Sequence, residues 1–240
     1  MDTKKFNKGN VKMVAHRGVS GLERENTVPA FLAACQRTHF GVETDVRVTK
    51  DGKFVLHHDS TPERVSNGKY NCVIEESTLA ELQSLVLPDR DGSEIRQDIR
   101  IPSLAEYVHV CKKYDKKCVL EIKTPFTEEK LSRMVDEIKS LDYLDGMIFI
   151  SFYAENCKIL RKLTNNKIQF LAGELSDSVL EMCKEYRFDL DDRCTDISKE
   201  WVDRFHAEGL EVNVWTVDSP EAAEKYAEMG VDYITSNILE

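Results

Sequence analysis

The sequence predicts an α/β protein, and within that class a TIM (β/α)₈ barrel with a small insertion after the second strand. Short apolar strands alternate with helical patterns along almost the whole chain, which is typical of βαβ units and a parallel sheet. The chain has 240 residues, close to the roughly 250 residues of a usual barrel of this kind. Its predicted parallel strands number eight, as such a barrel requires.

The first strand is expected at residues 11–16. A helix then runs to Gln36, capped by Asn26 or Thr27 and carrying Pro29 in its first turn. The other parallel strands are expected at 41–49, 118–122, 146–151, 168–172, 188–190, 211–216 and 232–235. Further helices are expected at about 128–140, 154–164, 177–186, 198–208 and 219–229.

A ninth apolar run, at 54–58, follows the second strand too closely to form a parallel crossover. The Asp51-Gly52 pair between them favours a hairpin turn, so this run is predicted to be an antiparallel arm. With Asp51-Gly52 as a two-residue loop, Lys50 pairs with Lys53. Counting back from that pair places Asp45 opposite His58.

Residues 59–102 form the predicted insertion, which is expected to lie over the mouth of the barrel. Capping boxes start one helix at Thr78, with Glu81, and the next at Ser103, with Glu106. No linker, repeat or low-complexity segment interrupts the chain. Residues 1–240 are therefore predicted to form a single domain.

Charge and cysteine content restrict the expected partners and location. The formal net charge of −10 disfavours nucleic acid and anionic membranes as partners. The seven cysteines include no Cys-x-x-Cys pair, which favours reduced thiols. The first 12 residues lack an apolar signal segment, and no apolar run is long enough to insert into a membrane. These features predict a cytoplasmic protein; they give no indication of its oligomeric state.

Three acidic residues on two neighbouring strands predict a metal site. Glu43 and Asp45 share one face of the second strand, and Glu121 shares a face of the next strand with Lys123. Buried acids are costly unless they are paired or bind a metal. An all-oxygen cluster suits one divalent cation such as Mg²⁺ or Ca²⁺. For the Glu-x-Asp pattern alone, exposure at the surface is the alternative.

Two histidines are candidate catalytic residues, because His16 ends the first strand and His58 ends the hairpin arm. Catalytic groups of barrel enzymes lie at the carboxyl ends of the strands. Two imidazoles beside a metal would supply the acid and the base that phosphodiester cleavage requires. Either histidine alone would more simply have a structural role. His58 is preferred over His57 because the hairpin count turns His57 to the opposite face.

Substrate contacts are expected from Arg17, Lys123 and Trp215. Arg17 and Lys123 offer positive charge to phosphate oxygens, with internal salt bridges to the acids as the alternative. Trp215 ends a strand and is expected to form an apolar wall of the pocket rather than to fill the core.

Together these motifs resemble the glycerophosphodiester phosphodiesterase family over nearly the whole chain. The resemblance implies a barrel enzyme that uses a divalent metal to hydrolyse small glycerophosphodiesters to glycerol 3-phosphate and an alcohol. It implies Glu43, Asp45 and Glu121 as metal ligands, and His16 and His58 as the acid–base pair. It also implies phosphate contacts from Arg17 and Lys123. The matching segments are Val14-Ala15-His16-Arg17-Gly18, Glu25-Asn26-Thr27, Glu43-Thr44-Asp45-Val46, Thr49-Lys50-Asp51-Gly52, His57-His58-Asp59, Leu120-Glu121-Ile122-Lys123, Ser151-Phe152 and Val214-Trp215-Thr216-Val217.

One departure is that many relatives end the last strand with Thr-Asp, where this chain has Thr235-Ser236-Asn237. It is expected to affect only the rim of the pocket. The sequence leaves open the nucleophile, the leaving alcohol and which histidine is the acid. The rival interpretations are a cyclising phospholipase of the phosphatidylinositol-specific type, an enzyme acting on lysophospholipid head groups, and a barrel that binds ligands without catalysis.

Overall fold

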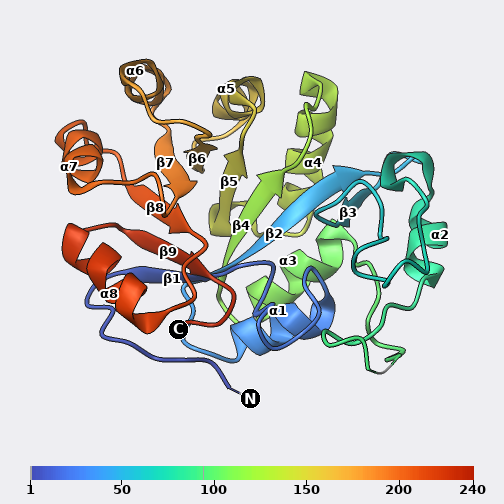
Figure 1. The fold of residues 1–240 in the computed structure, drawn as a ribbon. Coiled ribbons are helices and arrows are strands. Elements are labelled where there is room, and N and C mark those ends of the chain that lie inside the picture. The colour runs from blue at the N-terminus through green and yellow to red at the C-terminus, as the bar shows by residue number, and fades with distance from the viewer. Residues whose placement is uncertain (1, 94) are drawn as a thin grey trace.

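Eight parallel strands form a closed ring at the centre of the protein, which confirms the predicted fold class (Figure 1). The computed structural model describes residues 2–93 and 95–240. Strands follow one another in the order β1-β9-β8-β7-β6-β5-β4-β2, and pairing of β1 with β2 closes the ring. The barrel strands are β1 (Lys12–Ala15), β2 (Gly41–Val48), β4 (Lys117–Ile122), β5 (Met147–Ser151), β6 (Lys167–Leu171), β7 (Asp189–Arg193), β8 (Val212–Trp215) and β9 (Tyr233–Ser236).

Helices surround this ring and bury one apolar face against it (Figure 1). Outward-facing strand residues such as Val42, Leu120 and Val214 join the buried faces of the helices in one large apolar cluster. The helices are α1 (Val28–Cys35), α2 (Leu79–Ser84), α3 (Leu104–Lys113), α4 (Glu128–Ser140), α5 (Ala154–Leu163), α6 (Asp177–Tyr186), α7 (Lys199–Ala207) and α8 (Pro220–Met229).

Helix starts follow the capping signals of the sequence. Thr27, not Asn26, caps α1 by accepting a hydrogen bond from Ala30 N. The two predicted capping boxes are confirmed at α2 and α3, where the Thr78 and Ser103 side chains each accept from the third helical N–H. Local side-chain chemistry thus sets where each of these helices begins.

The antiparallel arm β3 (Phe54–Leu56) is confirmed, but its predicted register is wrong by one residue. Thr49 N donates to Lys53 O at 2.8 Å, so three residues form the loop rather than two. Gly52 takes a φ of +72°, which suits the last residue of a three-residue hairpin loop. As a result Asp45 lies opposite His57, and His57 N donates to Asp45 O at 2.9 Å.

The segment between β3 and α3 packs as a lobe beside the barrel, at the right of Figure 1. It contains α2 and a short 3-10 helix (Ile74–Glu76). Its apolar side chains form a small cluster of their own around Val55 of β3. The hairpin arm therefore anchors the lobe to the barrel.

β7 is longer than predicted, because it runs to Arg193 instead of ending at Leu190. The added residues include Asp191 and Asp192, and aspartate is depleted in strands. Pairing with β6 and β8 on both sides overrides this weak local preference. The extension matters because it places an acidic side chain in the pocket described below.

Candidate active site

A pocket opens at the carboxyl ends of the barrel strands and collects most of the predicted site residues. Among the described residues it is lined by His16, Arg17, Glu43, His58, Glu121, Lys123, Ile150, Phe152, Leu171, Asp191, Trp215 and Thr235. Asp45, the one predicted site residue outside this lining, lies fully buried behind it, where it contacts Arg17 and Lys123. The fold therefore brings all eight predicted side chains to one place.

Glu43, Asp45 and Glu121 form the acidic cluster of the site. Each offers one carboxylate oxygen, and these oxygens all lie within 4.8 Å of one another. Asp45 lies directly across from Glu121 because β2 and β4 pair in parallel. Asp45 Oδ1 is buried and accepts no hydrogen bond from the residues that the structure describes, although Lys123 Nζ lies 3.4 Å away. Three buried carboxylates with an unsatisfied oxygen are a donor set that fits a hard divalent cation.

Mutual repulsion in this cluster shifts the acidity of its members. Burial, and then the Asp45 carboxylate, raise the pKa of Glu43 well above its usual range. Burial also opposes ionisation of Asp45, but Arg17 and Lys123 hold the pKa of that carboxyl below its usual value. Burial and Asp45 raise the pKa of Glu121 to about 7. Without a cation, the protein therefore keeps part of this cluster protonated.

The metal-free protein is expected to lose stability as the pH rises from 4.5, the ordinary value for glutamate, to about 7. Over this interval folded Glu121 retains a proton that the unfolded chain releases, so the free energy of unfolding falls with pH. Glu121→Gln should remove this part of the slope, as measured by urea unfolding in chelator at several pH values. Glu128→Gln, at an exposed position of α4, is the control. Parallel pH profiles for wild type and Glu121→Gln would contradict the expectation.

Arg17 is held by the turn that follows β1. Its φ is +53°, and that of Gly18 is +77°. A Cβ on Gly18 would lie 2.6 Å from the backbone of Ala30, so the turn requires glycine there. In this turn Arg17 N donates to Glu43 Oε2 at 2.8 Å. Arg17 Nε is buried and lies 3.4 Å from Asp45 Oδ2, but it makes no hydrogen bond with the described residues.

His16 is oriented by a residue that the sequence pattern had assigned only to the rim. Its Nδ1 lies 2.7 Å from Asn237 Oδ1, while Asn237 Nδ2 donates to Asp218. Because the amide oxygen of Asn237 must accept, His16 Nδ1 carries the hydrogen and Nε2 is left with a lone pair. Burial and then Arg17 lower the pKa of His16 to about 4. A predicted catalytic histidine is therefore held by Asn237, the residue that follows Ser236 at the end of the last strand.

His58 lies just beyond the end of β3, so the wrong hairpin register does not decide where its side chain points. It lines the pocket, whereas the side chain of His57 is buried and places Nε2 3.1 Å from Thr61 O. His58 Nδ1 lies 2.7 Å from Asp59 Oδ1. Burial lowers the pKa of His58, and the Asp45 and Asp59 carboxylates oppose that change.

Arg64, in the lobe, links the segment that follows β3 to the segment that follows β1. Its guanidinium donates to Asp59 Oδ2 at 2.7 Å and to both carboxylate oxygens of Glu25 at 2.7 and 2.8 Å. Glu25 in turn accepts from Arg17 at 2.8 Å. One continuous chain of ion pairs therefore joins His58 to Arg17.

Arg64→Ala is expected to lower kcat roughly tenfold, because partners behind active-site groups typically have effects of this order. Arg64→Lys should restore only part of the loss, since lysine cannot form the two-pronged contact with Glu25. Steady-state kinetics would measure both variants. Arg100→Ala, which removes an arginine bonded to main-chain oxygens of the same lobe, is the control. An unchanged kcat in Arg64→Ala would show that the ion-pair chain does not position His58.

Asn26 is a further functional residue that sequence reasoning underestimated. Its side chain donates to Asp45 Oδ2 at 2.7 Å and accepts from Thr44 at 2.7 Å. Its left-handed φ of +53° is one that asparagine tolerates better than most residues. The Glu25-Asn26-Thr27 motif marked this segment as notable, but no local signal indicated a contact with β2.

Trp215 and Phe152 form the aromatic side of the pocket, as expected for Trp215. Their ring centroids are 5.9 Å apart and the rings meet edge to face at 89°. Ile150 and Leu171, each 3% exposed, extend this apolar wall. The pocket is thus polar on the side of β1, β2 and β4 and mainly apolar on the other.

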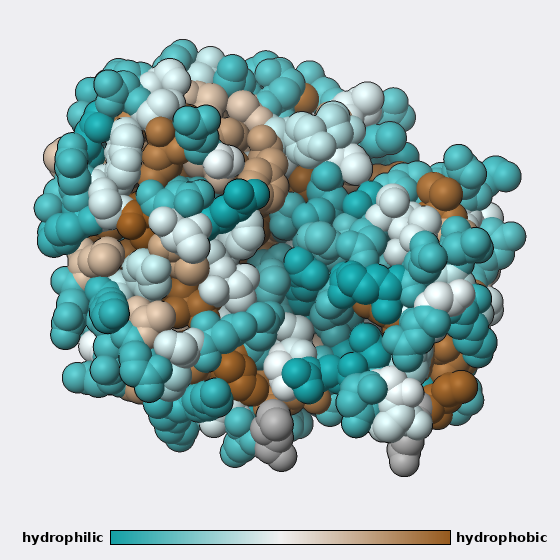
Figure 2. Space-filling model, in the orientation of Figure 1, coloured by the Kyte–Doolittle hydropathy of each residue, from teal (hydrophilic) through white to brown (hydrophobic). Residues whose placement is uncertain are grey.

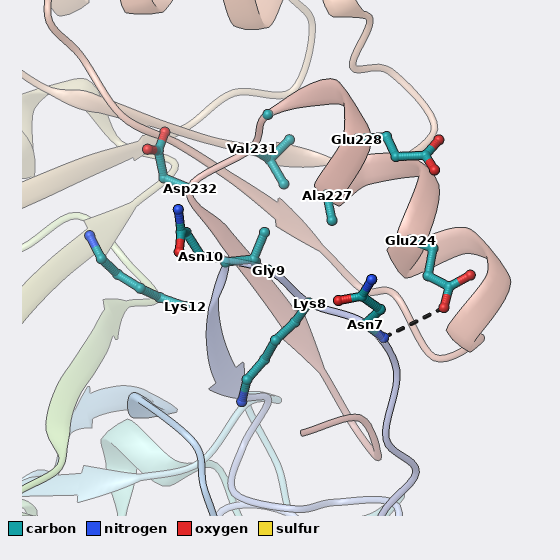
Figure 3. Close-up of a pocket in the computed structure, with 12 residues that line it drawn as sticks. Asn7, Lys8, Gly9, Asn10, Lys12, Glu224, Ala227, Glu228, Val231 and Asp232 are labelled. Carbon is teal, nitrogen blue, oxygen red and sulfur yellow. Dashed lines mark hydrogen bonds between the residues drawn. The ribbon is translucent and has the colours of Figure 1, made fainter.

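A larger hollow lies away from this chemistry, between residues 7–12 and α8 (Figure 3). Its volume is about 580 Å³, against about 60 Å³ for the pocket above. Its charged side chains, including Lys8, Glu224 and Glu228, lie apart, and the single bond drawn joins Asn7 N to Glu224 (Figure 3). Converging acidic and imidazole groups, rather than size, identify the functional pocket.

Comparisons with known proteins agree with this geometry. Residues 16–239 match the model of the glycerophosphoryl diester phosphodiesterase family. A glycerophosphodiester phosphodiesterase of Caldanaerobacter subterraneus subsp. tengcongensis is 30% identical over 233 residues, covering 94% of this chain and 93% of that protein.

Solved structures show the same likeness. An Oleispira antarctica phosphodiesterase in complex with the product sn-glycerol-3-phosphate superimposes with a TM-score of 0.86 at 25% identity, covering 98% of this chain and 96% of that one. The glycerophosphodiester phosphodiesterase of Thermotoga maritima gives 0.78 at 27% identity, covering 95% and 94%. The chain therefore belongs to the glycerophosphoryl diester phosphodiesterase family and is a phosphodiesterase.

Proposed function

We propose that this enzyme hydrolyses glycerophosphodiesters to glycerol 3-phosphate and an alcohol, with one divalent cation, Mg²⁺ or Ca²⁺, and two histidines. The observation that carries the proposal is the convergence of Glu43, Asp45 and Glu121 beside His16 and His58 in one pocket. The product named with the Oleispira antarctica structure supports the same substrate class. We further propose that residues 1–240 act as a single domain, with the insertion at 59–102 supporting the site through Arg64.

Glu43, Asp45 and Glu121 would hold the cation. When bound, it would offset the negative charge that develops on the phosphate oxygens. Arg17 and Lys123, whose side chains line the pocket, would bind the same phosphate group through their N–H donors. Arg17 Nε and Lys123 Nζ each lie 3.4 Å from the Asp45 carboxylate, so both positively charged side chains are already beside the acidic cluster.

His16 is the better candidate for the general base. Its Nδ1–H is directed to an amide oxygen, so its Nε2 lone pair is free to remove a proton from water or from a glycerol hydroxyl. In the second case the alcohol would leave with formation of a cyclic phosphate, and water would then open that ring to give glycerol 3-phosphate. His58 is the better candidate for the acid. The Asp59 carboxylate stabilises a protonated imidazole more than the neutral amide beside His16 does. The proton would pass from His58 Nε2 to the departing alcohol oxygen.

The surface and the helices can be compared with the rival interpretation, an enzyme that acts on lysophospholipid head groups. Hydrophilic residues cover most of the face shown in Figure 2, and hydrophobic residues occur there in separate patches. Among the described residues, no helix combines the length and the apolar character needed to cross a bilayer. No observation favours lysophospholipids over water-soluble diesters.

A coupled assay for released glycerol 3-phosphate tests the proposal. The substrates would be the glycerophosphodiesters of choline, ethanolamine, inositol and glycerol, each with added Mg²⁺ or Ca²⁺ and with chelator. We expect metal-dependent turnover of at least one of them. Absence of product from all four with either metal would refute the proposed activity.

A further inference from the structure

Lys123 lies one residue beyond the end of β4, on an irregular segment that leads to α4. The main chain of residues 123–126 forms one hydrogen bond to other main-chain groups of the described residues, from Lys123 N to Val46 O at 3.4 Å. Glu121, by contrast, is paired on both sides within the sheet. Both side chains line the pocket, but the sheet does little to fix the position of Lys123.

Two buried side chains from the next strand and helix hold this segment. Ser151 ends β5 and is fully buried, and Asn156, in the first turn of α5, is 1% exposed. Ser151 Oγ donates to Ile122 O at 2.9 Å. Asn156 Nδ2 donates to Thr124 O at 2.9 Å, and Asn156 Oδ1 accepts from Phe126 N at 2.9 Å. The two side chains also bond to each other, with 3.1 Å between Asn156 Nδ2 and Ser151 Oγ. This pair, the Ser151–Asn156 clamp, therefore fixes main-chain groups on both sides of the lysine.

The start of α5 does not account for the clamp. Every other α-helix among the described residues begins with a Ser or Thr side chain that accepts a hydrogen bond from a helix N–H. At α5 this position is Tyr153, and its side chain makes no such bond. Ser151 Oγ accepts from Tyr153 N at 3.2 Å, but the amide of Asn156 bonds to the loop after β4 and to Ser151 instead of to the first N–H groups of α5. The polar groups of the clamp thus serve the neighbouring loop.

We propose that Ser151 and Asn156 are positioning residues, which hold Lys123 beside the acidic cluster and thereby increase the affinity of the site for a phosphate group. Lys123 Nζ lies 2.8 Å from Glu121 Oε1 and 3.4 Å from Asp45 Oδ1. A lysine side chain is long and flexible, so a main chain that is fixed at its base reduces the disorder that phosphate binding must remove.

This inference rests on the phosphate contact proposed above for Lys123 and names the residues that position it. It also gives a role to the Ser151-Phe152 segment, which the sequence comparison singled out. The pocket lining includes Phe152 but not Ser151, so direct contact with a ligand does not explain the serine.

A double-mutant cycle with Lys123→Met tests the inference, measured by calorimetric titration with sn-glycerol 3-phosphate in Mg²⁺ and, separately, in Ca²⁺. In the wild-type background, Ser151→Ala and Asn156→Ala should each weaken binding about tenfold, as is usual when a partner behind a site residue is lost. In the Lys123→Met background the same substitutions should change the Kd by less than about twofold, because the side chain through which they act is gone. Equal weakening in both backgrounds, or none in the wild-type background, would overturn the inference.

Asn166→Ala is the matched control. Asn166 also holds main-chain oxygens through its side-chain amide, with bonds to Leu144 O at 2.7 Å and Met147 O at 3.0 Å. These oxygens lie at the amino end of β5, the end opposite Ser151, so binding of sn-glycerol 3-phosphate should stay unchanged in both backgrounds. If Asn156→Ala does not fold, as judged by thermal unfolding, Ser151→Ala decides the test, since it removes a single oxygen atom.

The titration requires no turnover, so it separates this inference from the proposed hydrolysis. If no glycerophosphodiester were hydrolysed, the proposed function would fail, and the cycle would still decide the role of the clamp. Equal weakening in both backgrounds, in an enzyme that does hydrolyse these diesters, would reject the clamp alone. If wild type bound no sn-glycerol 3-phosphate with either metal, the phosphate contact of Lys123, and with it this inference, would be overturned.

Discussion

Replacement of His16 or His58 by alanine is expected to lower kcat by about 10²- to 10⁴-fold, the usual contribution of a general acid or base. The two residues occupy the same pocket as the acidic cluster, and each is held through Nδ1 by a separate partner. Steady-state assays with a glycerophosphodiester at saturating metal would measure the loss. Because neither side chain belongs to the apolar core, thermal unfolding should remain close to that of wild type.

His109→Ala is the control for this experiment, since His109 is exposed on α3 and lies outside the pocket lining. Its kcat should equal that of wild type. Near-normal turnover in both the His16 and the His58 variant would remove the acid–base assignment. A loss of turnover in only one of the two variants would mean that only that histidine transfers a proton in the reaction. The pH dependence of kcat in the remaining variant would then show which limb of the profile disappears.

Removal of the cation by chelation is expected to reduce turnover by about 10³-fold or more, because a metal contributes several kcal/mol of charge stabilisation. Added Mg²⁺ or Ca²⁺ should restore it. Binding should also be visible without catalysis. Metal at a hundredfold excess over its Kd would stabilise the folded protein by about 2.7 kcal/mol, measured by urea unfolding. Physically, a bound cation would offset the repulsion among Glu43, Asp45 and Glu121, which raises the pKa of Glu43 and of Glu121 in the metal-free protein.

Asp45→Asn separates metal binding from a general effect of added salt. This variant removes the carboxylate that lies between Arg17 and Lys123, and it should lose both the restored turnover and the metal-dependent gain in stability. Asp136→Asn, at an exposed position of α4, should keep both responses. Full activity of wild type in excess chelator would refute metal dependence. Equal stabilisation of wild type and Asp45→Asn would place the bound ion elsewhere.

Regular patterns made the barrel predictable. The period of two in the strands and the helix caps at Thr78 and Ser103 are properties of neighbouring residues, so they can be read without the fold. The predicted hairpin register was wrong because it depends on the backbone conformation of a single residue in the loop. The hairpin loop has three residues because Gly52 adopts a left-handed conformation, and this moved the partner of Asp45 by one position.

The convergence of Glu43, Asp45 and Glu121 was predictable for a similar reason. Residues two apart on a strand share a face, and β4 is the next parallel strand after β2, so their proximity follows from strand periodicity and strand order. The contacts of Asn237 with His16, and of Arg64 with Asp59 and Glu25, have no such local rule. They join segments separated by up to 221 residues.

The sequence by itself determined the ring of strands, the acids and histidines at its carboxyl end, and the sign of the charges around them. These follow from periodicities and spacings that act over a few residues or between consecutive strands. Only the tertiary structure decided which groups contact the two histidines and which acidic side chain lines the pocket from β7. Asp191 lies in a strand segment of low β-propensity, and only pairing with β6 and β8 turns its side chain into the pocket.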